Sequence, residues 1–199
     1  MVNKANPKLI TSLDTESFQT QDFTIPETDI VQLAANQHEE LFALDKKGTV
    51  LKITLSDSKV ESFPSAEKLK YTAIAANHGF VAVAASKQVD YTCENTVLLY
   101  DNKMSLLSKD SSAKLGGSIT HSYLYQVNLE LCLGEAFPLI TAISYNNERV
   151  LFAYGVEHEK LILRGRKLAI HNDACYDLKY INDSYWTCSE DMFLLQFTF

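Results

Sequence analysis

The residues nearest in type to a metal site are His171, Cys175 and Cys188, close to the end of the chain. Structural zinc sites take four ligands, mainly cysteine thiolates and histidine nitrogens. The local sequence offers no fourth ligand beside these three, and no C-x-x-C pair occurs. We therefore predict no metal site and no cofactor. The four cysteines are interpreted as reduced thiols that pack as small apolar side chains, and they are Cys93, Cys132, Cys175 and Cys188.

A second group with catalytic residue types is Glu157-His158-Glu159, an acid and base cluster in an expected hairpin. Exposed hairpin tips are charged in many proteins without any catalytic role. The sequence also has no G-x-S-x-G elbow that would activate a serine nucleophile. Neither a P-loop nor the G-x-G-x-x-G pattern of dinucleotide binding occurs. We therefore predict no catalytic residue.

Four cations, Lys160, Arg164, Arg166 and Lys167, fall within eight residues of a chain whose formal net charge is -7. We expect this segment to form a strand, a turn and a second strand. Side-chain alternation places Lys160 and Arg164 on one face with Ile162. One interpretation is a solvated sheet edge, because edge strands are often protected by charge. The other is a docking patch for an acidic peptide or protein surface.

A polar stretch, residues 87–95, separates two apolar strands expected at residues 80–85 and 96–100. We expect this connection to be too long for a tight hairpin, and long connections often carry binding residues. The expected partner-binding residues in this stretch are Asp90, Tyr91 and Glu94.

These candidates sit on a chain with internal repeats. Four segments share one pattern, an apolar strand that ends at an asparagine and is followed by a second apolar strand. They are residues 30–36, 71–77, 140–146 and 176–182. The asparagines at 36, 77, 146 and 182 are therefore 41, 69 and 36 residues apart. A period near 40 residues is typical of propeller blades, whereas helical periodicity is weak throughout. The sequence predicts an all-β protein.

The most regular repeat is the last one, residues 171–199, which predicts three short strands in succession. A histidine, an apolar strand, a strand closing on S-x-D and a strand ending on an aromatic residue follow one another there. The residues concerned are His171, Leu178, Ser189, Asp191 and Phe197. This order resembles a degenerate WD repeat, without the Gly-His and Trp-Asp pairs of a regular one. In that family the aspartate lies in the turn between the second and third strands and helps tie it to the loop carrying the histidine. The resemblance therefore implies structural roles for His171 and Asp191.

The resemblance implies a WD-repeat-like β-propeller of about four blades, either a complete small ring or a partial propeller. The expected blades are residues 29–65, 66–119, 134–170 and 171–199. Residues 1–28 contain two further expected strands. Because the last blade has only three strands, we expect an N-terminal strand to close it. Residues 118–133 are expected to be an outer strand of the second blade or an extra arm.

Composition limits the class of partner. Hydrophobic residues make up 46% and charged residues 22%, as in an ordinary globular protein. The negative charge disfavours nucleic acid and membrane surfaces, which select basic faces. No apolar run has the length of a spanning helix, and the first residues lack the apolar core of a secretory signal. We therefore expect a cytoplasmic or nuclear protein.

Repeat architectures commonly serve as interaction platforms. We predict a non-catalytic protein-protein interaction scaffold, a subunit of a larger complex, with protein partners and with another chain completing the ring. The alternative function is a small propeller hydrolase or lyase, whose titratable residues would converge at the central opening. The alternative architecture is a paired β-sandwich instead of a radial array of sheets.

Overall fold

The computed structural model describes the following residues, and every structural statement below concerns these alone. They are residues 2–3, 6–13, 16–25, 28–35, 40–57, 59–65, 69–77, 79–89, 92–110, 127–132, 139–144, 150–167, 175–181, 184–189 and 191–197. Within them the chain consists of β-strands and short connections, without a helix. The prediction of an all-β protein is confirmed.

The strands follow one another at short intervals. In chain order they are β1 (Val2–Asn3), β2 (Asn6–Leu13), β3 (Thr20–Thr24), β4 (Ile30–Ala35), β5 (Glu40–Asp45), β6 (Val50–Thr54), β7 (Lys59–Phe63), β8 (Lys70–Asn77), β9 (Phe80–Val89), β10 (Thr92–Asp101), β11 (Leu106–Asp110), β12 (Val127–Cys132), β13 (Leu139–Ser144), β14 (Val150–Glu157), β15 (Lys160–Lys167), β16 (Cys175–Ile181), β17 (Ser184–Ser189) and β18 (Leu194–Phe197).

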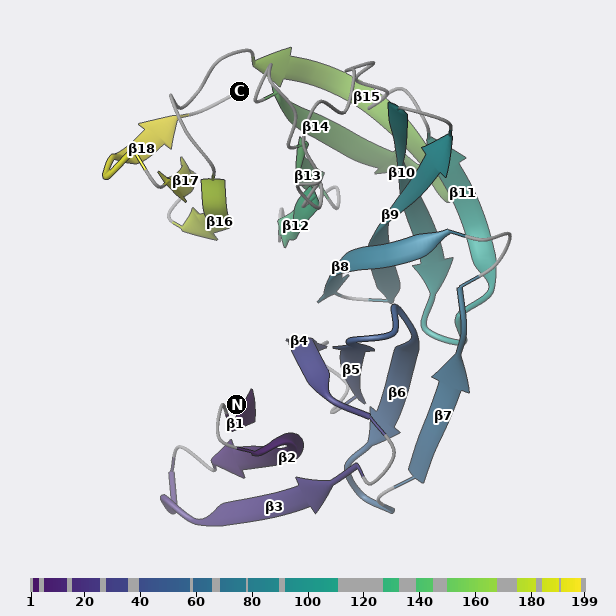
Figure 1. Cartoon of the computed structure of the whole chain (residues 1–199), viewed down its shortest axis with the longest axis vertical. Coiled ribbons are helices and arrows are strands. Elements are labelled where there is room, and N and C mark those ends of the chain that lie inside the picture. The colour runs from purple at the N-terminus through teal and green to yellow at the C-terminus, as the bar shows by residue number, and fades with distance from the viewer. Residues whose placement is uncertain are drawn as a thin grey trace.

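These strands form five antiparallel sheets, here numbered 1 to 5. Sheet 1 is β1 to β3, sheet 2 is β4 to β7, sheet 3 is β8 to β11, sheet 4 is β12 to β15 and sheet 5 is β16 to β18. The sheets succeed one another around an arc, with sheets 1 and 5 at its two ends (Figure 1). The innermost strands of sheets 2 to 5 contact one another in turn. This radial arrangement is that of a propeller, and it excludes the paired β-sandwich.

Strand β9 lies at the centre of the best-packed region. The side chains of Val81, Ala82, Val83, Ala84 and Ala85 are all 0% exposed. Because successive side chains of a strand point to opposite faces, β9 is buried on both faces. The apolar run at residues 80–85 predicts such burial, and the structure confirms it.

Two apolar cores join sheets 1, 2 and 3. The core between sheets 2 and 3 contains ten buried residues, namely Phe42, Leu44, Val50, Tyr71, Ile74, Val81, Val83, Ala85, Leu98 and Tyr100. The core between sheets 1 and 2 contains seven, namely Ile10, Phe23, Ile25, Ile30, Ala43, Leu51 and Ile53. Strands β5 and β6 thus place alternate side chains into two different cores.

Three hairpins close with the same kind of turn, at residues 45–49, 101–105 and 189–193. In each, the fourth residue donates its N–H to the carbonyl of the first, at 3.0, 3.0 and 3.2 Å. The fourth residue has a positive φ, which is 81° at Gly48, 63° at Met104 and 66° at Met192. A type I turn followed by a left-handed residue matches the twist of the paired strands. One turn geometry is therefore built from three different sequences.

The connection between β9 and β10 differs from the expected long loop. Pairing continues without a break from Ala85 opposite Thr96 to Val89 opposite Thr92. Only residues 90 and 91, outside the described part, lie between the two strands. The long-loop prediction was wrong because the polar stretch extends both strands, whose ladder satisfies its backbone hydrogen bonds.

Sheet 4 also departs from the expectations. Strand β12 lies within residues 118–133, which were expected to be an outer strand of the second blade or an extra arm. It pairs instead with β13, and the outer strand of sheet 3 is β11. Strand β15 runs unbroken where a turn was expected, because Arg164 forms a bulge between Leu163, opposite Tyr154, and Gly165, opposite Ala153. The described residues 140–144 of the third repeat segment belong to β13, the second strand of its sheet, whereas the described residues of the other three segments lie in first strands.

The N-terminal strands have a different place from the one expected. Strands β2 and β3 pair with each other, from Leu9 opposite Thr24 to Leu13 opposite Thr20, and form sheet 1 with β1. Their apolar side chains Ile10 and Phe23 pack into the core shared with sheet 2. Burial against sheet 2 therefore gives these strands a sheet of their own, and β16 to β18 remain three-stranded in the described residues.

Candidate functional site

Asp45 is a buried carboxylate in the turn between β5 and β6. Its side chain is 5% exposed. One oxygen, Oδ1, accepts the backbone N–H groups of Lys47 at 2.9 Å and Thr49 at 2.7 Å. The other, Oδ2, accepts the hydroxyl of Thr28 at 2.7 Å. Charge-assisted hydrogen bonds of this kind offset the cost of removing a carboxylate from water. Asp45 therefore fixes the turn and ties it to the connection that leads into β4.

The corresponding turn of sheet 5 contains Asp191. Its N–H donates to Ser189 Oγ at 3.2 Å, and its Oδ1 accepts the N–H of Phe193 at 3.0 Å. By strand register, Ser189 occupies the position of Asp45. The carboxylate of Asp191 therefore holds its own turn. The expected link to His171 stays a prediction, since His171 lies outside the described residues.

A groove of about 360 Å³ opens beside the Asp45 turn. Its walls come from the connection between β3 and β4, from the turn itself and from strands β6 and β7. The lining residues are the apolar Ile25, Leu51 and Val60, the hydroxyl residues Thr28, Thr49 and Ser62, and the charged Asp45 and Lys47. The volume lies in the range of ligand sites, which makes the groove the candidate binding site.

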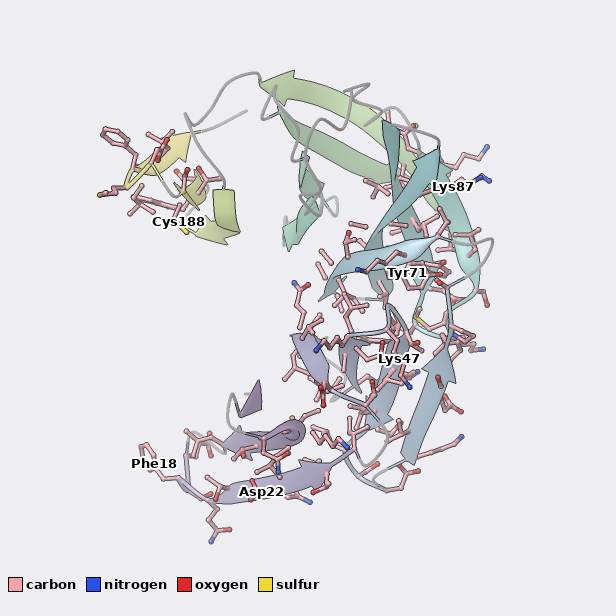
Figure 2. The ribbon with its side chains drawn as sticks, in the orientation of Figure 1. Phe18, Asp22, Lys47, Tyr71, Lys87 and Cys188 are labelled. Atoms are coloured by element: carbon pink, nitrogen blue, oxygen red, sulfur yellow. The ribbon has the colours of Figure 1, made fainter. Side chains whose placement is uncertain are left out.

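The groove lies at the outer strands of sheet 2, β6 and β7. Strands β1 and β2 of sheet 1 lie against β4, the innermost strand of sheet 2. Ile25 and Leu51 at the base of the groove are each 5% exposed, whereas Val60 on β7 is 44% exposed. The groove therefore has a buried apolar base and an accessible mouth. Lys47, labelled in Figure 2, is exposed at this turn.

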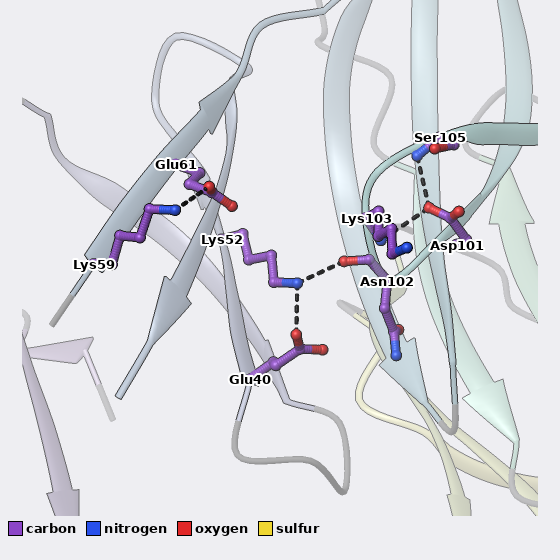
Figure 3. A network of polar contacts seen from close by, with 8 residues as sticks. All are labelled: Glu40, Lys52, Lys59, Glu61, Asp101, Asn102, Lys103 and Ser105. Atoms are coloured by element: carbon purple, nitrogen blue, oxygen red, sulfur yellow. Dashed lines mark hydrogen bonds and ion pairs between the residues drawn. The ribbon is translucent and has the colours of Figure 1, made fainter. Parts of the chain in front are cut away.

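On the opposite face of sheet 2, toward sheet 3, lies a partly buried ion pair. Lys52 Nζ lies 2.5 Å from Glu40 Oε1, and the two side chains are 12% and 21% exposed. The same ammonium donates to the carbonyl oxygen of Asn102 in sheet 3 at 2.7 Å (Figure 3). It also lies 5.9 Å from the ring centroid of Phe42. Lys52 therefore links sheets 2 and 3 by hydrogen bonding. The pair of Lys59 with Glu61 at 2.7 Å is exposed by comparison.

Two further polar contacts belong to the interface between sheets 2 and 3. The hydroxyls of Tyr71 and Tyr100 lie 2.8 Å apart in the core. Burial, together with the hydrogen bond to Tyr71, raises the pKa of Tyr100 well above its ordinary value. Gln32 Oε1 accepts the N–H of Ile74 at 3.1 Å across the two sheets. These groups are engaged with one another and connect the sheets.

The four predicted cations lie on one strand, β15, which is the outer strand of sheet 4. Lys160 is exposed at its start. Arg164 is the bulge residue. Arg166 and Lys167 pair with the neighbouring strand β14. The bulge interrupts the alternation on which the expected common face of Lys160 and Arg164 depends. Their docking role stays a prediction.

The second predicted group is not brought together with the first. Asp90 and Tyr91 lie outside the described residues. Glu94 belongs to β10, directly opposite Lys87 of β9, in a different sheet from the four cations. A partner role for Asp90, Tyr91 and Glu94 stays a prediction as well.

Large apolar side chains are exposed at both ends of the arc. In sheet 1, Phe18 is 77% exposed; in sheet 5, Met192, Phe193 and Leu194 are 95%, 61% and 63% exposed. Figure 2 shows Phe18 at one end of the arc and Cys188, in the sheet of these three residues, at the other. Grouped apolar exposure of this kind often marks an interaction surface.

The sequence did not predict the groove, although the turn beside it could be recognised. The stretch D-K-K-G-T at residues 45–49 predicts a turn, and its glycine fits the observed φ of 81° at Gly48. Nothing in that stretch indicates that Thr28 and Val60 lie beside it. The groove depends on contacts between distant segments.

Among the described residues, no group of three or more His, Cys, Asp or Glu side chains is placed to hold a metal ion. Cys188 has a free thiol. In the same part of the chain, no helix is long and apolar enough to cross a membrane.

Sequence comparison finds no family model and no curated protein that matches this chain. Solved structures do match. A chain of the crystal structure of a mitotic checkpoint complex matches 98% of this chain and 71% of its own length, with a TM-score of 0.55 and 9% identity. U3-55K and the WD40 repeats of RRP9 each match 92% of this chain, with a TM-score of 0.50 and 14% identity. They are covered over 68% and 67% of their own lengths. At these identities the likeness concerns the fold, and this chain has the fold of a degenerate WD40-type β-propeller.

Proposed function

We propose that the chain is a non-catalytic protein-interaction scaffold and a subunit of a larger complex. The observation that carries the proposal is the open arc of sheets with large apolar side chains exposed at both ends. The WD40-type fold supports it, because repeat architectures present extended surfaces on which partners dock. The net charge of -7 favours protein partners over nucleic acid or membrane. A cytoplasmic or nuclear setting belongs to the same proposal.

Another chain that completes the ring is part of this proposal. The five sheets match 71% of the checkpoint-complex chain. If the remainder of that chain had the same density of sheets, a full ring would hold about seven (5/0.71). The arc therefore has room for about two more sheets. Apolar side chains at its two ends suit burial against added sheets.

Affinity capture from native cell extract, with the full chain as bait, tests the scaffold. It is combined with the mass of the purified chain in solution by light scattering. We expect a specific captured protein or an assembly larger than the monomer. A monodisperse monomer that captures nothing would contradict the proposal.

A variant pair locates the contact. Met192→Ser with Phe193→Ser removes two exposed apolar side chains from sheet 5. Leu106→Ser is the matched control, because Leu106 is 53% exposed on β11 in the middle of the arc. We expect the double variant, and not the control, to lose the captured protein or the assembly.

The alternative of a propeller hydrolase or lyase has no specific observation in its favour among the described residues. Asp45 is engaged by three donors. The pair of Glu40 with Lys52 is partly buried, and its ammonium is hydrogen-bonded to sheet 3. Neither group is placed as a free acid or base in an accessible pocket.

A further inference from the structure

We propose that the groove beside the Asp45 turn binds an extended segment of a partner protein in which an aliphatic residue lies next to an acidic one. This inference rests on the proposed scaffold function and names the kind of segment that one surface would take.

The base of the groove selects an aliphatic side chain. Ile25 and Leu51 form a buried apolar base, and Val60 stays 44% exposed beside it. Covering this surface with an aliphatic side chain removes apolar area from water on both molecules. A polar side chain placed there would lose hydration, because these three residues offer it no hydrogen-bond partner.

The charge at the mouth selects a carboxylate. Asp45 is the acidic residue of the lining, and its oxygens already accept three hydrogen bonds. Lys47 is exposed, and no ion pair involves it in the described part of the chain. Lys46, also exposed, precedes it. The groove therefore presents a cation to an incoming ligand, although the chain as a whole is acidic.

The shape of the lining favours an extended segment. Val60 and Ser62 are alternate residues of β7, so they lie along one face of that strand. Ser62 is paired with Leu51 of the neighbouring strand. The apolar base and the hydroxyl of Ser62 thus follow the outer strand, and Thr49 adds a second hydroxyl. An extended peptide can place one side chain on the base and bond its backbone to hydroxyls of this kind.

The test is a selection of random seven-residue peptides on the full chain, followed by affinity measurement of the selected peptides. We expect the selected sequences to carry Asp or Glu within two positions of Ile, Leu or Val. We also expect their affinity to fall as salt is raised, because an exposed cation contributes to binding.

Two matched variant pairs place the peptide in the groove. Lys47→Glu is compared with Lys103→Glu, because Lys103 holds the same position in the turn at residues 101–105 and donates its N–H to Asp101 at 2.9 Å. We expect a loss of affinity of about tenfold or more for Lys47→Glu and little change for Lys103→Glu. Val60→Ser is compared with Val31→Ser, because Val31 is 58% exposed and lies outside the groove lining. Here we expect a loss of about threefold to tenfold for Val60→Ser alone.

The outcomes separate this proposal from the scaffold function. Equal effects within either pair would overturn the groove as the binding site, and so would failure to select any peptide. Selected peptides without an acidic and an aliphatic residue would overturn the stated chemistry. A partner captured equally by the wild type and by Lys47→Glu would leave the scaffold function standing and would place its contact elsewhere. Circular dichroism and thermal unfolding of each variant confirm that the fold is retained.

Discussion

Sheet 2 packs against sheet 3 on one face and against sheet 1 on the other, and the two interfaces differ in how completely side chains fill them. Toward sheet 3, a core of ten buried residues is supplemented by Lys52, which reaches the backbone of Asn102, and by the hydrogen bond from Ile74 to Gln32. Toward sheet 1, the core of seven residues leaves a groove at the outer strands. One interface is therefore filled by this chain's own side chains, and the other has a groove at its outer strands.

The difference arises from the neighbouring sheets. Sheet 3 has four strands, and its turn at residues 101–105 extends to Lys52. Sheet 1 has three strands, and β1 and β2 contact β4. A repeat with one strand fewer can thus leave a groove beside the next repeat.

The largest expected effect contrasts a filled position with an open one. Phe42 is 0% exposed in the core between sheets 2 and 3, so Phe42→Ala is expected to lower the free energy of unfolding by about 3–5 kcal/mol. Val60→Ala at the groove should change it by less than about 0.5 kcal/mol. Urea denaturation measures both. Phe42→Leu, a milder change, replaces the first variant if it does not fold. Similar costs at the two positions would contradict the contrast.

The next effect concerns the ion pair that links sheets 2 and 3. Lys52→Met removes the ammonium that pairs with the partly buried Glu40, and we expect a loss of about 2 kcal/mol in the free energy of unfolding. Adding Glu40→Gln should recover part of that loss. Lys59→Met removes an exposed ion pair and serves as the control, with no measurable change expected. If the two lysine variants were equally destabilised, the linking role of Lys52 would be wrong.

A smaller effect concerns the turn that packs against sheet 3. A Cβ at Gly48 would lie 3.2 Å from the backbone nitrogen of Tyr71, and φ there is 81°. Gly48→Ala should therefore cost about 1–2 kcal/mol in thermal or urea unfolding. Met192→Gly, at the same turn position in sheet 5, reports the backbone strain without such a neighbour. If Gly48→Ala lowers the free energy of unfolding by no more than Met192→Gly raises it, the contact between a Cβ at position 48 and the backbone of Tyr71 adds no cost, and the prediction is wrong.

The last effect is a pH dependence. The raised pKa of Tyr100 means that the folded chain retains a proton that the unfolded chain releases above about pH 10. Stability should therefore be complete below pH 10 and fall above it, by up to about 1.4 kcal/mol per pH unit. Tyr100→Phe should remove this dependence, although it leaves the Tyr71 hydroxyl without its partner. Urea denaturation between pH 9 and pH 11 tests the prediction, and an unchanged slope in the variant would refute it.

The sequence predicted the fold class because its signals are local. The apolar run at residues 80–85 is buried on both faces of β9, as its composition indicates. The described residues of the repeat segments that begin at residues 30, 71 and 176 lie in β4, β8 and β16, the first strands of three sheets. Period and composition sufficed for these features because each depends on a few consecutive residues.

The candidate site was not predictable in the same way. The cations of residues 160–167 stand out in the sequence, but a bulge at Arg164 interrupts the alternation that was expected to place Lys160 and Arg164 on one face. The groove residues Thr28, Lys47 and Val60 are ordinary in type and far apart in sequence. Exposed charge is visible to pattern analysis, whereas a gap between sheets is not.

Alternation of apolar and polar residues, turn-forming dipeptides and a repeat near 40 residues determined by themselves that this chain forms antiparallel strands grouped into blades. Tertiary structure alone decided that β1 to β3 form a separate sheet and that β12 belongs to sheet 4. It also decided that sheet 2 is covered on one side and open on the other. The reason is that strand formation depends on neighbours along the chain, while the choice of partner strand and partner sheet depends on which apolar faces bury each other.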